Sequence, residues 1–167
     1  MFPEGLAMAM TPDFLREMRP GEEPQVDALL RAAFGGAEEA DLVHLLRRSR
    51  EMAGEMVMAA GDQVVAYSGL SRMVGPKGWL CLAPVAVAPD WQGRRVGKRM
   101  IGLIAEWARI SGTTVVVLGH AGFYGKAGFS AARAARLTSP YPVDHTLLAG
   151  PGADAPAAAL VYPKAFG

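Results

Sequence analysis

Hydrophobic positions in the first third of the chain change from strand to helix spacing. Residues 14–18 alternate enough for a short strand, which Arg19-Pro20-Gly21 ends. Apolar residues then recur every three or four positions, which predicts two amphipathic helices. The first ends at the glycine pair 35–36 and the second spans about residues 37–49. Their expected apolar faces are Val26, Leu29, Leu30, Ala33 and Phe34 in the first helix, and Leu42, Leu45 and Leu46 in the second.

Three strands are predicted next. Residues 56–60 and 64–73 read as a hairpin around Gly61-Asp62. A third strand, 79–87, has few polar side chains, which indicates burial on both faces. Pro84 interrupts it, and because proline lacks a backbone donor, the strand is expected to bulge or part from a neighbour there.

The second half of the chain begins with an amphipathic helix from Val96, whose apolar stripe is expected at positions 96, 100, 103, 104 and 107. Residues 113–118 are rich in β-branched side chains and predict a buried parallel strand. Strand, helix and strand form a crossover unit. A short helix at 123–127, a proline-rich stretch at 140–156 and a last strand near 158–162 complete an α/β chain with a mixed sheet.

Length, charge and cysteine content limit the classes of protein to which the chain can belong. The 167 residues, with 51% hydrophobic and 20% charged content, fit one domain, expected over 13–167 after a loose extension at 1–12. Because 17 Lys and Arg balance 16 Asp and Glu, no global field points to nucleic acid or a membrane surface. Cys81 is the only cysteine and no secretory signal or bilayer-length apolar run is present, so a cytoplasmic location is the default expectation. Three histidines and one cysteine at wide spacings predict no metal site.

The connection between the third strand and the following helix carries a local positive charge. Arg94, Arg95, Lys98 and Arg99 are expected in the first turns of that helix, where the macrodipole is already positive and free N–H groups converge. Such an arrangement is stabilised by an anion, although a solvated basic helix start is the alternative. Walker A and Rossmann phosphate loops are excluded, because neither glycine pattern is present in this turn.

Two segments resemble the signatures of the GNAT acetyltransferases. Residues 82–97 resemble the family's acetyl-CoA motif, whose core is Gln or Arg, two residues, Gly, one residue, and Gly or Ala, beginning here at Gln92. Residues 123–129 resemble the second signature, which starts with an aromatic residue and Tyr and finishes with Gly-Phe. Leu118-Gly119, Tyr141-Pro142 and residues 161–163 are similar to a subgroup called YhbS-like.

The resemblance covers roughly residues 13–166 and implies a GNAT acyl-CoA N-acyltransferase fold, a mixed sheet of about six or seven strands flanked by about four helices. It also implies that strand backbone beside Pro84 pairs with the pantetheine arm and that amides of the Gln92 turn hold the pyrophosphate. Arg95 stands where the family has its first motif glycine, and it is expected to hold a helical conformation. The residues implied in acetyl-CoA binding are Val85, Ala86, Val87, Gln92, Gly93, Arg94, Arg95, Val96, Gly97, Lys98 and Tyr124.

Acetyl transfer to an amine needs an acid for the departing thiolate, an oxyanion donor and a neutral nucleophile. A phenol with a pKa near about 10 can protonate an alkyl thiolate, and the resemblance places Tyr124 in that role; a tyrosine that only packs its helix is the alternative. The resemblance also gives the oxyanion contact to the Val85 backbone N–H. His120 is a candidate base, with a structural histidine or a water relay as alternatives.

The sequence therefore predicts an N-acetyltransferase that uses acetyl-CoA as co-substrate, needs no metal, and acetylates a primary amine by direct attack in a ternary complex. The alternatives are a non-catalytic acyl-CoA-binding module and a plain interaction domain. The acceptor amine is not readable from the sequence. Neither nucleic acid nor membrane is an expected partner, and the oligomeric state stays open between a monomer and a homodimer.

Overall fold

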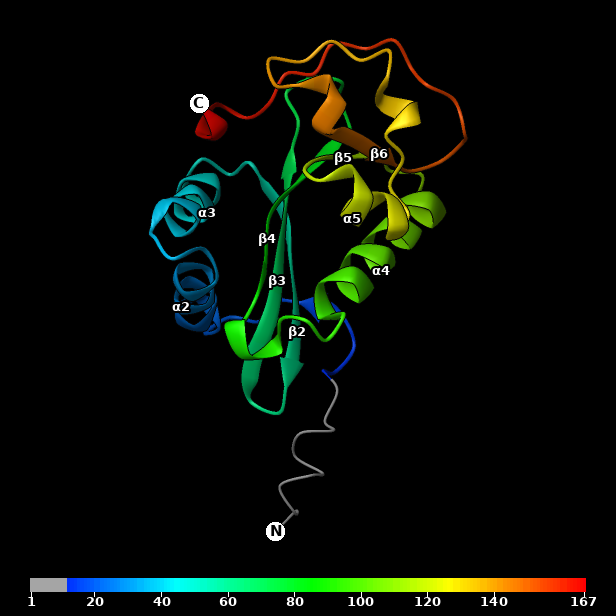
Figure 1. The fold of residues 1–167 in the computed structure, drawn as a ribbon. Coiled ribbons are helices and arrows are strands. Elements are labelled where there is room, and N and C mark those ends of the chain that lie inside the picture. The colour runs from blue at the N-terminus through cyan, green and yellow to red at the C-terminus, as the bar shows by residue number, and fades with distance from the viewer. Residues whose placement is uncertain (1–11) are drawn as a thin grey trace.

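A mixed six-stranded sheet lies at the centre of the computed structural model, which describes residues 12–167 (Figure 1). The strands follow one another in the order β1-β2-β3-β4-β5-β6, and every neighbouring pair is antiparallel except β4 and β5, which are parallel. The parallel pair is joined by a helical crossover, as predicted. The strand bounds are Arg16–Glu17, Met52–Ala60, Gln63–Arg72, Leu80–Val87, Val115–Leu118 and Thr146–Ala149 for β1 to β6.

Four helices cover the two faces of the sheet. In Figure 1, α2 and α3 lie over one face and α4 and α5 over the other. Each pair closes its own apolar core: Val26 and Leu30 of α2 pack with Tyr67 of β3, while Met100 and Ile104 of α4 pack on the opposite side. The helices are α2 Glu23–Phe34, α3 Glu38–Arg48, α4 Val96–Ser111 and α5 Ala121–Lys126, with short 3₁₀ turns η1 Pro89–Trp91, η2 Ala132–Ala134, η3 Val143–His145 and η4 Lys164–Phe166. None of the helices in residues 12–167 combines the length and apolarity that crossing a membrane requires.

Several sequence predictions need correction. Leu46 of α3 is buried as expected, but Ala40 and Val43 complete the buried face in place of Leu42 and Leu45, because the helix is rotated by part of a turn from the expected orientation. Strand β2 begins four residues earlier than predicted. The strand expected near 158–162 forms only isolated bridges, whereas β6 lies inside the proline-rich stretch that predicted no strand.

The apolar stripe of α4 is also partly different from the prediction. Val96, Met100 and Ile104 are buried as expected, but Leu103 and Trp107 remain 42% and 44% exposed. Ile101, Ala105 and Ala108 are buried in their place. The helix therefore carries a second apolar stripe that the sheet does not cover.

Strand β4 bulges and then separates from β5. Ser68 pairs with Val85 and Leu70 with Leu82, so two residues of β4, Ala83 and Pro84, stand opposite Gly69 alone. A Cβ on that glycine would lie 2.9 Å from the Ala83 carbonyl oxygen, which explains why glycine fits there. On the other side, β5 pairs with β4 only at its first two residues. Both parts of the Pro84 prediction are confirmed.

Burial along β4 alternates instead of being complete on both faces. Pro84 and Ala86 are buried, whereas Val85 and Val87 point to the other face of the sheet and are half-buried at the margin of the core that contains α4. The loose extension predicted for residues 1–12 lies outside the described residues apart from Pro12, which is buried and lines a cavity beside α4.

Candidate functional site

The half of β4 that lies beyond the bulge has free backbone groups. The Ala88 N–H donates to the Val65 carbonyl on β3 at 2.8 Å. Because successive residues of a strand direct their backbone groups to opposite sides, the N–H groups of Val87 and Val85 point away from β3, to the side where β5 has diverged. This edge can accept an extended ligand by strand-like pairing.

The turn between η1 and α4 presents a run of unpaired donors. The consecutive backbone N–H groups from Gly93 to Lys98 donate to no acceptor among residues 12–167. Hydrogen bonding of the helix starts with the Arg99 N–H, which donates to the Arg95 carbonyl at 3.0 Å. Gly93 and Arg95 both have positive φ, 76° and 62°, and alternation of left- and right-handed residues turns successive N–H groups toward one concavity. The turn therefore has the backbone geometry that suits an anion, at the start of a sixteen-residue helix.

Two residues of the acetyl-CoA motif, Gln92 and Gly97, stabilise the structure of this turn. The Gln92 side chain donates from Nε2 to the Val87 carbonyl at 3.0 Å, and its own N–H donates to Pro89. The side chain therefore holds the turn against the end of β4, while its contact with a ligand stays a prediction. Gly97 allows α4 to approach β4 closely, since a Cβ there would lie 3.3 Å from Val87 Cγ2 and 3.6 Å from Phe123 Cζ.

The expectation that Arg95 adopts a helical conformation is wrong. The residue caps α4 with φ 62° and ψ 16°, in the left-handed region, and the helix proper begins only at Val96. Arg94 and Arg95 thus precede the helix in which they were predicted to lie. The geometry explains the family's preference for glycine here, because a side chain in this region costs roughly 1–2 kcal/mol.

We expect the substitution Arg95→Gly to stabilise the fold. Relief of the left-handed strain should exceed the added entropy of the unfolded chain, giving a free energy of unfolding about 0.5–1 kcal/mol above that of Arg95→Ala. Arg95→Ala is the matched control, since it removes the same charge but keeps a Cβ. Urea denaturation measures both, and an Arg95→Gly protein less stable than Arg95→Ala would contradict the assigned backbone geometry.

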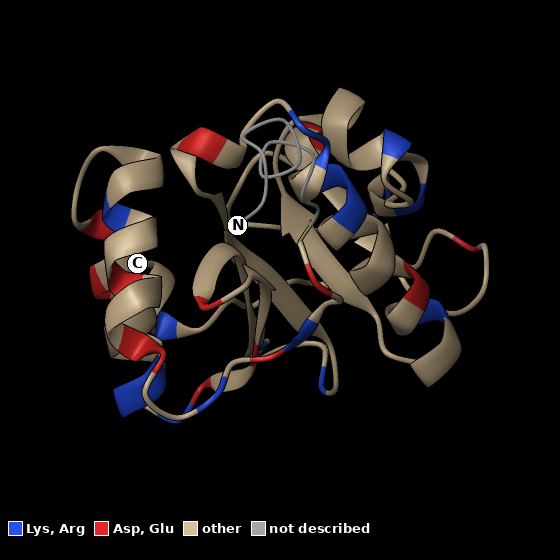
Figure 2. Ribbon diagram, turned by 90° about the horizontal axis from the view of Figure 1, so that it is seen from below, with Lys and Arg blue, Asp and Glu red and all other residues tan. Residues whose placement is uncertain are grey.

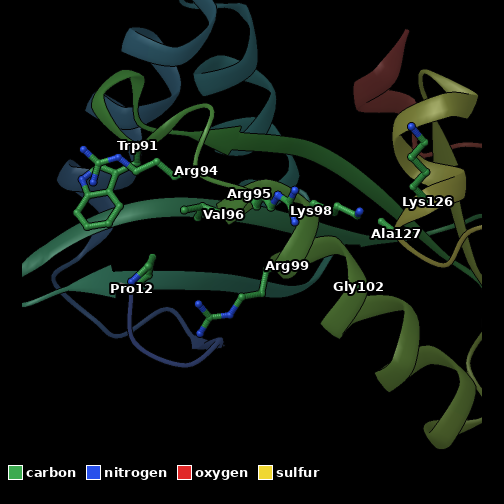
Figure 3. Close-up of a pocket in the computed structure, with 10 residues that line it drawn as sticks. All are labelled: Pro12, Trp91, Arg94, Arg95, Val96, Lys98, Arg99, Gly102, Lys126 and Ala127. Carbon is green, nitrogen blue, oxygen red and sulfur yellow. The ribbon is translucent and has the colours of Figure 1, made fainter. Parts of the chain in front are cut away.

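Basic side chains surround this turn. A cavity of about 440 Å³ lies along the first turns of α4, and no carboxylate lines it. Figure 3 shows Arg94 over the Trp91 ring, with its guanidinium carbon 4.8 Å from the ring centroid. Lys126 reaches the same cavity from α5, and the view in Figure 2 shows the blue stretches at the start of α4 next to one another. The residues that line the cavity are Pro12, Trp91, Arg94, Arg95, Val96, Lys98, Arg99, Gly102, Lys126 and Ala127.

None of these cations forms an ion pair within the part of the chain that the structure describes, whereas Arg16, Arg31, Arg47, Arg109 and Arg133 all do. A smaller neighbouring cavity, about 370 Å³, joins the turn to Val87 and Phe123 at the end of the open strand edge. The unpaired cations, the free N–H groups of the turn and the open edge of β4 therefore lie next to one another along one continuous path. This path suits a long ligand with an anionic head and a polar chain.

Tyr124 lies on α5, the helix that follows β5. Its ring makes edge contacts with Phe123 and Phe129, at centroid distances of 5.0 and 6.1 Å. The ring is half-buried, and burial raises the pKa of its hydroxyl. That hydroxyl makes no hydrogen bond to another residue between 12 and 167. The residue therefore presents a protonated, unengaged donor.

Gly119 provides the space for the Tyr124 ring. A Cβ at this position would lie 2.9 Å from Tyr124 Cδ2 and 3.3 Å from Cζ, and it would come still closer to Cε2. In the sequence, Gly119 stood out only as part of a subgroup pattern. The structure gives it a specific packing role.

We therefore expect Gly119→Ala to displace the Tyr124 ring. Overpacking should lower the free energy of unfolding by about 1–3 kcal/mol, and misplacement of the hydroxyl should lower kcat for acetyl transfer about 10- to 100-fold. Gly125→Ala on the same helix is the control, because no atom lies within 4 Å of its added Cβ. Steady-state rates and urea melts of the two variants measure the effect, and equal kcat values would show that the ring position is unimportant.

His120 precedes α5 and is exposed. Its ring lies against Gly122, where a Cβ would be 3.0 Å from the imidazole Cε1, and no carboxylate in the described chain hydrogen-bonds to it. Asp27 orients a different histidine, His44, at 2.9 Å, so that helix-face histidine has a structural role. Within residues 12–167, no three His, Cys, Asp or Glu side chains converge as metal ligands.

Three residues that line the cavity were not predicted as binding residues. Trp91 and Lys126 were not selected, and Arg99 was named only as one of the basic residues of the turn. Trp91 could have been found from its place three residues before Arg94, a spacing that lets an arginine stack on an aromatic ring. Lys126 could not, since only the packing of α5 beside α4 brings it there.

Comparison with known proteins places these features in a family. Residues 53–131 match the model of the acetyltransferase (GNAT) domain. The chain is 34% identical over 121 residues to the uncharacterized N-acetyltransferase YjhQ of Escherichia coli K12. The match covers 66% of this chain and 66% of YjhQ, so the chain spans just under two thirds of that relative's length. It is 31% identical over 119 residues to the uncharacterized N-acetyltransferase YhbS of the same strain, covering 68% of this chain and 71% of the relative.

Solved structures agree with this result. The crystal structure of Escherichia coli YhbS in complex with CoA has the same fold, with a TM-score of 0.78 at 24% identity over 94% of this chain and 93% of that one. A GNAT acetyltransferase from Brucella melitensis in complex with acetyl-CoA superposes with a TM-score of 0.75 at 26% identity, over 92% of this chain and 97% of the other. Both the expected fold and the expected family are confirmed.

Proposed function

This chain belongs to the GNAT family of N-acetyltransferases, and from that premise we propose that it transfers the acetyl group of acetyl-CoA to a primary amine. The observation that supports this most strongly is the run of unpaired N–H groups from Gly93 to Lys98, next to unpaired cations and at the end of a free strand edge. Two of the solved relatives carry CoA or acetyl-CoA, which agrees with the same ligand here.

The binding residues divide by the part of the co-substrate they fit. The pyrophosphate suits the N–H groups of the Gly93–Lys98 turn, with Arg94 and Lys98 as charged partners. The pantetheine arm, which carries amide groups, suits the free N–H group of Val87, while the N–H of Val85 is left for the thioester. The Val87 carbonyl already accepts from Gln92, so on this edge the Val85 carbonyl is the acceptor.

In the proposed reaction, the amine nitrogen bonds to the acetyl carbon while the carbon–sulfur bond breaks. In this proposal the Val85 N–H donates to the carbonyl oxygen as negative charge develops on it. The Tyr124 hydroxyl supplies a proton to the departing sulfur, and because burial raises the pKa of this phenol, the proton is present at neutral pH. No metal is required for this exchange of bonds and protons.

The proton that the amine loses has two candidate acceptors. His120 lies at the end of β5 and is exposed, so its imidazole is accessible from solvent. A water relay is the other, since β4 between Leu80 and Val87 carries no carboxylate. If water accepts the proton, kcat of His120→Gln should stay close to the wild-type value, whereas loss of a base should lower kcat.

Release of the CoA thiol in the presence of a panel of primary amines tests the function. We expect turnover with at least one amine and none without an acceptor beyond slow hydrolysis. Binding of CoA without turnover for any amine would favour a non-catalytic acyl-CoA-binding module, which the left-handed Arg95 and the missing β4 carboxylate make the relevant alternative.

A further inference from the structure

An apolar groove lies between the middle of α4 and the first two strands of the sheet. Leu103 and Trp107 contribute from α4 and Phe14 from the segment before β1, and all three side chains are exposed. The cavity has a volume of about 420 Å³, which is the size of a small-molecule site. The described residues that line it are Phe14, Leu15, Glu17, Ala53, Gly54, Met56, Leu70, Leu80, Leu103, Ile104 and Trp107. None of them lines either cavity of the Gly93–Lys98 turn, so the groove is separate from the candidate acetyl-CoA site.

An irregularity in β2 provides the space for this groove. The register of β2 against β3 shifts between Met52 and Gly54, and both Ala53 and Gly54 line the groove. In a regular strand these two neighbours would face opposite sides of the sheet. A Cβ added at Gly54 would have no atom within 4 Å, so the space beside it is unfilled. Deeper in the groove, Leu70 and Ile104 are buried and give it an apolar base.

The groove carries one charged side chain. Glu17 is the only charged residue among the described residues that line it, and it is exposed, which places its carboxylate at the rim. Arg16 precedes it on β1 and points to the other side of the strand, where it pairs with Glu22 at 2.8 Å. Glu17 forms no ion pair within residues 12–167. The groove is therefore apolar inside, with an uncompensated negative charge at its rim.

We propose that this groove binds a small organic cation with an apolar body, such as an arylalkylammonium ion. The apolar body covers the exposed side chains of Phe14, Leu103 and Trp107 and removes their surface from water. The Glu17 carboxylate attracts the cationic head group, and the face of an indole ring such as that of Trp107 attracts cations as well. An anion of the same size is repelled by Glu17, and a neutral molecule leaves that carboxylate without a partner.

Three probes with a common phenylalkyl body test the proposal on the full-length protein. They are (4-phenylbutyl)trimethylammonium, 4-phenylbutan-1-ol and 4-phenylbutyrate. The quaternary ammonium ion cannot be acetylated, so its binding is distinct from turnover as an acceptor. Saturation-transfer NMR titrations give the affinities, and we expect the cation to bind with a dissociation constant of roughly 0.1–3 mM. It should bind about fivefold more tightly than the alcohol, and the carboxylate should bind most weakly.

The position of the bound cation is read from the indole N–H signal of Trp107, which is assigned with Trp107→Phe. The cation should shift this signal more than those of Trp79 and Trp91. Trp107→Ala should weaken binding of the cation and the alcohol about tenfold, because both lose the largest apolar contact of the groove. Ile110→Ala is the matched control, since Ile110 is exposed on the same helix but does not line the groove.

Glu17→Gln tests the role of the charge separately from that of the apolar body. It should weaken binding of the cation about fivefold and leave the affinity for the alcohol unchanged, since the amide keeps the size of the side chain. Glu38→Gln is the control, because it removes the same charge from an exposed position on α3, over the other face of the sheet. Equal affinities for all three probes, or a cation affinity that Glu17→Gln leaves unchanged, would overturn the proposal.

Addition of saturating CoA separates this proposal from the proposed function. The cation should bind equally well in its presence, because no residue lines both the groove and the cavities of the Gly93–Lys98 turn. Competition between the two ligands would assign the cation to the other site and refute this groove. A protein that binds the cation at Trp107 but binds no CoA would support the groove while contradicting the proposed function.

Discussion

Tyr124→Phe is expected to lower kcat for acetyl transfer about 10²–10³-fold, while the dissociation constant for acetyl-CoA changes by less than about twofold. The substitution removes one hydroxyl and keeps the ring, whose edge contacts with Phe123 and Phe129 hold α5 in place. Without the phenol, the sulfur must leave as a thiolate or take a proton from water. The effect therefore appears in the chemical step, which single-turnover measurements with saturating acetyl-CoA report directly.

Tyr141→Phe is the matched control for the loss of a tyrosine hydroxyl. The Tyr141 hydroxyl donates to the Phe166 carbonyl at 3.0 Å, in the carboxyl-terminal segment rather than on α5. Its kcat should stay within about threefold of wild type. If Tyr124→Phe turns over as fast as this control, the packing interpretation of Tyr124 is correct and its acid role is not.

The largest effect on binding is expected from reversing two charges at the turn, Arg94→Glu with Lys98→Glu. Each cation lines the cavity and neither is engaged in an ion pair of the described chain, so both are available to a pyrophosphate. Loss of two charge-assisted contacts together with the new repulsion should weaken CoA binding about 10²–10³-fold. Calorimetric titration measures this affinity, and the wild-type value should fall with added salt more steeply than that of the variant.

Stability should change in the opposite direction from binding in this variant. Glutamate near the start of α4 interacts favourably with the helix macrodipole, so the free energy of unfolding should be unchanged or rise by about 0.3–1 kcal/mol. Lys77→Glu with Lys164→Glu is the control, because it makes the same change in net charge on exposed residues remote from α4. Equal CoA affinity in the two double variants would contradict an anion site at this turn.

Local patterns predicted the parts of the site that lie close together in sequence. The bulge at Pro84, the helix from Val96 and the anion-binding turn between them all follow from residue chemistry over fewer than about 20 positions. The proline removes a donor, the glycines permit the turn, and the basic residues gather at a helix start. The bulge at Pro84 and the helix from Val96 are confirmed, while anion binding at the turn stays a prediction.

The remaining features depend on packing between distant segments. Arg95 is left-handed because the chain must turn sharply from η1 into α4, which is a condition that the arginine itself does not signal. The outer stripe of α4 was expected to be buried because Leu103 and Trp107 are apolar, but the rotation of the helix on the sheet leaves them exposed. Strand β6 forms because β5 offers it an antiparallel partner, despite the prolines that flank it.

Calorimetric titration of the wild-type protein with CoA tests the central claim most directly, because it requires no knowledge of the acceptor amine. The free donors of the Gly93–Lys98 turn and the unpaired cations of its cavity predict one CoA per chain, with a dissociation constant between roughly 1 μM and 1 mM. Arg94→Glu with Lys98→Glu should abolish most of that heat. Absence of binding by the wild type at millimolar CoA would contradict the assignment of this turn as an acetyl-CoA site.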